Sequence, residues 1–200
     1  MFINQKLGEI NIKIVYYGPP LSGKTTNLEH IHQRIPAQQR GELVSLKTRG
    51  DRTLFFDYMQ LELPPIQGMK PKFNLYTVPG QVAYTASRKL VLQGADAVIF
   101  VADSQSDRMQ DNLQSLYDLY QNLKEAGTDP QQTPLVVQFN KRDLEDAAPT
   151  SEIKEVLRLQ NYDIPSFEAV ATQGDGVIET LKLTINNVLH KLQSEKIYEN

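Results

Sequence analysis

A short stretch near the N-terminus has the residue types and spacing of a phosphate-binding loop. Residues 18–25 read Gly-Pro-Pro-Leu-Ser-Gly-Lys-Thr, which matches the pattern G-x-x-x-x-G-K-T. The stretch follows an apolar run at 10–17 and leads into a helix-like segment, the setting that this pattern requires. Its two glycines let the backbone curl around an anion, so that N–H groups and the positive end of the following helix point at one phosphate. The alternative is a tight turn with an incidental lysine.

Each polar residue of this loop has an expected role. We expect Lys24 to reach the β- and γ-phosphates as a point charge, and the hydroxyl of Thr25 to ligate Mg²⁺. The residues predicted to contact the nucleotide here are Gly18, Pro19, Leu21, Ser22, Gly23, Lys24, Thr25 and Thr26.

A second polar motif, Asn140-Lys141-Arg142-Asp143, follows the apolar run 135–139. The carboxylate of Asp143 can accept two hydrogen bonds from the N1 and exocyclic amino groups of guanine, a donor pair that adenine lacks. Asn140 is expected to serve the loop and the base edge, and the aliphatic stem of Lys141 to cover the ring. Alone, N-K-x-D is a weak match, because polar turns of this kind are often idle. Combined with the upstream loop, it predicts a guanine nucleotide site.

Strand-like and helix-like segments alternate along the rest of the chain. This order predicts an α/β fold with a mixed, mostly parallel sheet and helices on both faces. A proline and glycine turn joins two strands at 53–63 and 72–78 into an antiparallel hairpin. The segment 44–51 is ambiguous, and residues 1–7 could add a short N-terminal strand. Other expected strands are 10–17, 95–102, 135–139 and 166–169, and expected helices are 24–34, 86–92, 108–125, 151–158 and 176–192.

Composition limits the compartment and the partners. The 200 residues are a usual size for one domain, so we expect a single domain over 1–200. A net charge of −3 gives no reason to expect nucleic acid. The chain has no cysteine, no apolar run of membrane-spanning length and Phe2 where a myristoylated protein has glycine, which indicates a cytoplasmic protein without a direct membrane anchor.

With both motifs in place, nearly the whole chain resembles the Ras-like small GTPases. This resemblance implies a P-loop NTPase with a Ras-like G domain, a six- or seven-stranded sheet and one antiparallel edge hairpin. The segment Thr77-Val78-Pro79-Gly80-Gln81 departs from the superfamily, because the usual D-x-x-G places an aspartate where Thr77 stands. Together with the segments 16–28, 52–57 and 87–89, this departure resembles the bacterial MglA family of polarity and gliding-motility GTPases.

The resemblance implies the catalytic and switch residues. Gln81 would orient the attacking water, and Thr53 would sense the γ-phosphate and Mg²⁺. Arg52 would supply a positive charge in cis, with a solvent-facing loop arginine as the alternative. Pro20 would crowd the approach of an external arginine, with stiffening of the loop by Pro19 and Pro20 as the alternative. The metal would be held by Thr25 and the nucleotide, joined by Thr53 in the triphosphate state.

Two further loop positions follow from the register of the family. Gly80 is the glycine of the Thr77–Gln81 segment, and Ala171 with Thr172 occupies the loop whose backbone N–H contacts the guanine oxygen.

The expected function is a switch that binds GTP or GDP with Mg²⁺, hydrolyses GTP slowly alone and acts in cell polarity or gliding motility. The expected partners are a Roadblock/LC7-type activating protein, like MglB, and effectors at the switch face. The protein would be a monomer on its own and would be recruited to cell poles by partners. A nucleotide-gated scaffold with negligible hydrolysis is the alternative, because the carboxylate expected at Thr77 is missing.

Overall fold

A computed structural model describes residues 1–47, 55–66, 68–79, 85–161 and 163–198. These residues form an eight-stranded sheet in the order β3-β4-β5-β2-β6-β7-β8, with β1 paired to β2. The strands are β1 (Phe2–Asn4), β2 (Glu9–Tyr17), β3 (Val44–Lys47), β4 (Phe55–Glu62), β5 (Lys70–Thr77), β6 (Ala97–Asp103), β7 (Leu135–Asn140) and β8 (Ser166–Glu168). The α-helices are α1 (Lys24–Arg34), α2 (Thr85–Leu92), α3 (Met109–Glu125), α4 (Thr150–Val156) and α5 (Val177–Tyr198). Short 3₁₀ turns are η1 (Ala37–Gln39), η3 (Ser106–Arg108) and η4 (Leu159–Asn161).

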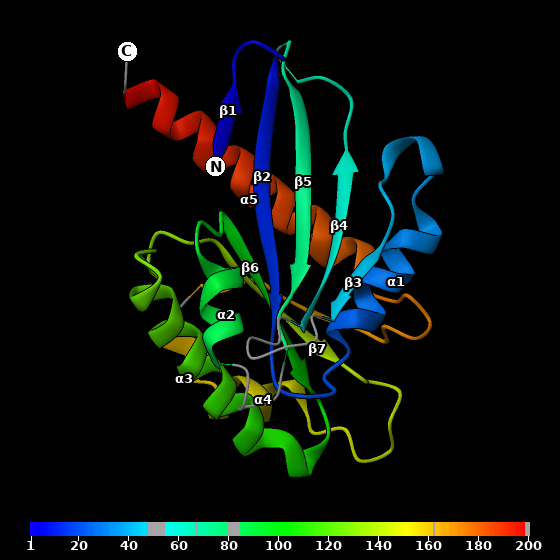
Figure 1. Cartoon of the computed structure of the whole chain (residues 1–200). Helices are drawn as coiled ribbons and strands as arrows, with labels where there is room; N and C mark the ends of the chain where they lie inside the picture. The colour runs from blue at the N-terminus through cyan, green and yellow to red at the C-terminus, as the bar shows by residue number, and fades with distance from the viewer. Residues whose placement is uncertain (48–54, 67, 80–84, 162, 199–200) are drawn as a thin grey trace.

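The centre of the sheet is parallel and covered on both faces. β2 pairs in parallel with β5 and β6, and the parallel ladder continues through β7 to β8. Every residue of β6 is buried, as expected of a central strand between two layers of helices. α1 and α5 pack on one face, whereas α2, α3 and α4 pack on the other (Figure 1). The predicted α/β class and mostly parallel sheet are confirmed.

The antiparallel part of the sheet differs from the prediction in two ways. The predicted hairpin is present as β4 and β5, but it does not form the edge, because β3 pairs antiparallel with β4 outside it. β1 pairs antiparallel with β2, so the sheet has eight strands, not six or seven. β1 is the short N-terminal strand that residues 1–7 could add, and β3 lies in the segment 44–51 whose sequence pattern is ambiguous.

Most helix boundaries lie within two residues of those predicted. The largest difference is at α5, which extends to Tyr198 and not only to about residue 192. The additional residues include no glycine or proline that would end a helix. Among the helices of the described residues, none combines the length and apolar character needed to cross a bilayer.

Candidate functional site

The loop after β2 has the backbone geometry of an anion cradle. Gly18 and Gly23 adopt φ values of 148° and 98°, which side chains other than hydrogen rarely allow. A Cβ at Gly18 would lie 2.2 Å from the carbonyl oxygen of Val101, and one at Gly23 would lie 2.2 Å from Nδ2 of Asn140. Gly23 is also the N-cap of α1, so the positive end of an 11-residue helix opens onto the loop.

Lys24 is a buried cation folded over this cradle. Its side chain is 6% exposed, and Nζ donates to the carbonyl oxygens of Gly18 at 3.0 Å and Pro19 at 2.6 Å. Burial and the nearby Arg88 guanidinium lower the pKa of the Lys24 ammonium from 10.5 to about 7, and the Asp57 carboxylate offsets only part of this. A cation held by carbonyl groups in a desolvated loop favours an anionic ligand.

Ser22 precedes the second glycine of the loop. The residue is fully buried, and its hydroxyl has no hydrogen-bond partner within the protein.

A pocket of about 320 Å³ lies between the phosphate loop and the second motif. It brings together three segments that are far apart in the sequence, all of which were expected to surround one nucleotide. Leu144 is the one lining residue that the sequence analysis did not single out, and it directly follows Asp143. The lining residues are Leu21, Gly23, Thr26, Asn140, Lys141, Asp143, Leu144, Ala171 and Thr172.

Asn140 holds the three segments of the pocket together. Its Nδ2 donates to the carbonyl oxygen of Ser22 at 2.7 Å, and its Oδ1 accepts the backbone N–H of Ala171 at 2.9 Å. The residue is 2% exposed. The structure thus gives Asn140 two loop contacts, which position the pocket walls.

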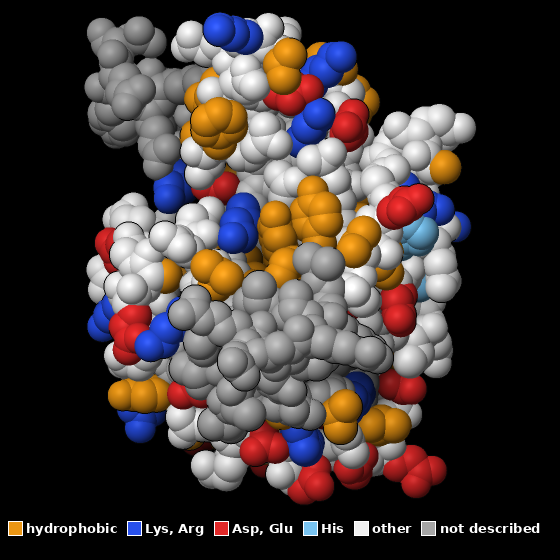
Figure 2. Space-filling model, viewed as in Figure 1, with side chains coloured by type: hydrophobic (Ala, Val, Ile, Leu, Met, Phe, Trp, Pro, Cys, Tyr) orange, Lys and Arg blue, Asp and Glu red, His pale blue; other side chains and the backbone are white. Residues whose placement is uncertain are grey.

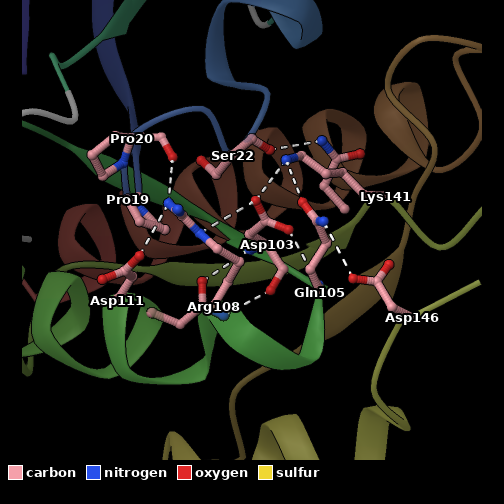
Figure 3. A network of polar contacts seen from close by, with 12 residues as sticks. Pro19, Pro20, Ser22, Asp103, Gln105, Arg108, Asp111, Lys141 and Asp146 are labelled. Atoms are coloured by element: carbon pink, nitrogen blue, oxygen red, sulfur yellow. Dashed lines mark hydrogen bonds and ion pairs between the residues drawn. The ribbon is translucent and has the colours of Figure 1, made fainter. Parts of the chain in front are cut away.

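A charged network connects the second motif to the phosphate loop (Figure 3). Nζ of Lys141 lies 2.6 Å from the buried carboxylate of Asp103 and 3.2 Å from Oε1 of Gln105. Nη2 of Arg108 donates to the carbonyl oxygen of Pro20 at 2.9 Å, and Nε of Arg108 lies 3.9 Å from the same Asp103 carboxylate. Asp103 therefore joins Lys141, which lines the pocket, to Arg108.

The predicted metal ligand Thr25 touches an aspartate that the sequence analysis did not select. Oγ1 of Thr25 donates to Oδ2 of Asp57 at 2.7 Å, and Oγ1 of Thr77 donates to the same oxygen at 2.9 Å. The predicted hairpin contains the signal that could have identified it, because pairing the two strands places Asp57 opposite Thr77. Among the described residues, no group of three or more histidine, aspartate or glutamate side chains is placed to hold a metal ion.

Four predicted residues lie outside the described residues: Arg52, Thr53, Gly80 and Gln81. Their predicted roles stay predictions.

Comparisons with known proteins agree with one another. The profile of the ADP-ribosylation factor family matches residues 1–188. The chain is also 53% identical over 192 residues to "Mutual gliding-motility protein MglA" of Myxococcus xanthus (strain DK1622). This alignment covers 96% of the chain and 97% of that relative.

Proposed function

Because the chain belongs to the ADP-ribosylation factor family of small GTPases, we propose that it is a switch whose GTP-bound state drives gliding motility or cell polarity. It binds guanine nucleotide and hydrolyses GTP, as members of this family do. The motility assignment is supported by the 53% identity to a relative named a mutual gliding-motility protein.

The base pocket is the observation that carries this proposal. Asp143 lines the same pocket as the phosphate loop residue Gly23 and the Ala171 segment. In our proposal, the Asp143 carboxylate accepts the guanine N1 and amino hydrogens, while the N–H groups around Gly23 and Lys24 hold the phosphates. Asn140 and Lys141 then act chiefly as positioning residues, since their polar atoms are bonded to the loop and to Asp103.

Mg²⁺ is the proposed cofactor, and the residues present fit it. The hydroxyl of Thr25 and the carboxylate of Asp57, which are hydrogen-bonded to each other, offer oxygen atoms, and oxygen is the ligand atom that Mg²⁺ prefers. Thr25 would hold the ion, joined by Thr53 when GTP is bound. The ion would neutralise charge on the β- and γ-phosphates.

The proposed chemistry uses Gln81 to orient water and Arg52 to stabilise charge in the transition state. Both assignments depend on motif register, because the two residues lie outside the described part of the chain. Phosphoryl transfer depends mainly on positioning and electrostatics, so loss of Arg52 should slow the chemical step while nucleotide binding persists. Arg108 holds the Pro20 carbonyl and stiffens the loop that the phosphates would contact.

A Roadblock/LC7-type activator and effectors are the proposed partners, and they would also recruit the protein to cell poles. The face of β4 and β5 opposite α1 offers aromatic side chains for such contacts. The Tyr76 ring packs at a tilt against Tyr58 and Phe56, with ring centroids 4.9 Å and 5.9 Å apart, and Lys13 lies over the Tyr76 ring. These side chains are only half-buried, and hydrophobic side chains gather over β4 and β5 in Figure 2. Proteins commonly use exposed patches of this kind as binding surfaces.

Replacing the base-reading carboxylate tests the proposed nucleotide specificity. Asp143→Asn replaces an acceptor with an amide, so we expect GTP affinity to fall about 100-fold or more and xanthosine triphosphate to bind better than GTP. Competition of both triphosphates against a fluorescent GDP measures this. The matched control is Glu145→Gln, which neutralises an exposed carboxylate of the same turn outside the pocket lining. Unchanged base preference in Asp143→Asn would remove that residue from the site.

A further inference from the structure

The sheet supplies a carboxylate close to Thr77, the position at which related GTPases have an aspartate. Tyr58 of β4 faces Tyr76 of β5, so the next pair along the antiparallel ladder is Asp57 and Thr77. Side chains alternate along a strand, and Met59 and Leu75, two residues away, belong to the core packed against α1. Asp57 and Thr77 therefore point to the face on which α1 begins.

Four hydrogen bonds hold Asp57 beside the phosphate loop, and its carboxylate accepts three of them. Oδ2 accepts the hydroxyls of Thr25 at 2.7 Å and of Thr77 at 2.9 Å, and Oδ1 accepts the hydroxyl of Ser45 at 2.6 Å. The backbone N–H of Asp57 returns a bond to Oγ1 of Thr77 at 2.9 Å. The threonine that replaces the usual aspartate thus gives its only proton to the aspartate of the next strand.

This arrangement has a specific consequence for Thr25. A hydroxyl that ligates a cation uses an oxygen lone pair, so its proton remains free for another acceptor. Carboxylates that accept such protons orient the metal ligand and increase its basicity. The contact between Thr25 and Asp57 leaves the hydroxyl oxygen of Thr25 with lone pairs to offer.

We propose that Asp57 is the positioning carboxylate of the Mg²⁺ site, supplied from β4 because Thr77 of β5 has none. The proposal rests on the Mg²⁺-dependent nucleotide binding proposed above. It assigns Ser45 and Thr77 the task of holding Asp57. It also explains how a site with the neutral Thr77 in place of the usual aspartate retains a negative charge near the metal ligand.

The Mg²⁺ dependence of nucleotide release tests this assignment without any measurement of turnover. The full chain is loaded with mant-GDP, and release is followed at a series of free Mg²⁺ concentrations. We expect Asp57→Asn to shift the Mg²⁺ concentration that half-slows release upward by about 10–100-fold, the usual cost of losing an outer-shell partner. Release in excess EDTA should match the wild type, which shows that the nucleotide pocket is intact.

Exchanging the two residues across the strand pair distinguishes an effect of the missing charge from damage to the fold. Asp57→Thr alone should shift the Mg²⁺ midpoint upward, and the double variant Asp57→Thr with Thr77→Asp should return it toward the wild-type value. An unchanged Mg²⁺ midpoint in Asp57→Asn, or no recovery in the double variant, would overturn the assignment of Asp57 but leave the proposed function standing. Failure of the wild type to retain mant-GDP with Mg²⁺ would overturn the proposed function as well.

Discussion

At the residue scale, the most informative side chain is Lys24, whose charge depends on whether an anion is bound. Burial lowers the pKa of its ammonium to about 7 in the empty loop. A bound phosphate favours the charged form and raises that pKa. Above pH 7 the empty site therefore holds fewer protons than the loaded site, so nucleotide affinity should fall as the pH rises through this pKa.

The number of protons taken up when nucleotide binds measures this change in the protonation of Lys24 directly. At pH 8 the terminal phosphate of GDP is already ionised, so Lys24 alone should take up roughly half a proton or more per GDP bound. Calorimetry of the nucleotide-stripped chain, in two buffers with different ionisation enthalpies, gives that number. In Lys24→Arg the guanidinium stays charged, and uptake should vanish. Zero uptake by the wild type at pH 8 would contradict the lowered pKa.

At the scale of elements, the start of α3 is tied to the phosphate loop through Arg108. Its side chain lies between the Pro20 carbonyl and the carboxylates of Asp103 and Asp111. Because Asp103 also binds Lys141, one buried carboxylate at the end of β6 couples the phosphate loop to the base motif. Weakening this link should therefore change the rate at which bound nucleotide is released.

Removing Arg108 is expected to speed nucleotide release. Arg108→Ala deletes a partly exposed, charge-assisted hydrogen bond worth about 1 kcal/mol, so mant-GDP should leave about three to ten times faster. Arg34→Ala, which removes an exposed arginine from the end of α1, is the matched control and should release at the wild-type rate. Equal release rates in both variants would show that the link to α3 does not hold the loop.

Elements and motifs with local signals could be predicted from the sequence. α1 was predicted with its observed bounds, because it begins at the loop glycine and ends just before Pro36. The position of Asp57 was missed because its role depends on which residue faces it across β4 and β5. The Asp103 network was missed for the same reason, and the segment 44–51 that contains β3 was ambiguous, since contacts distant in sequence create both features.

At the scale of the whole molecule, the site is where the carboxyl ends of the parallel strands meet. β2 leads into the phosphate loop, β6 ends at Asp103, β7 ends at Asn140, and the chain after β8 reaches Ala171. Open α/β sheets bind ligands at this edge. A nucleotide in this pocket would contact the three segments that follow β2, β7 and β8.

Single-turnover phosphate release by the full chain with Mg²⁺ tests the central claim, that the protein is a guanine-specific GTPase switch. We expect GTP to be converted to GDP and phosphate, ATP to remain intact, and Arg52→Ala to bind mant-GDP normally. With a Roadblock/LC7-type partner, turnover by Arg52→Ala should be slower than wild type by about 1,000-fold or more. Equal hydrolysis of ATP and GTP, or no GTP hydrolysis with or without a partner, would contradict the claim.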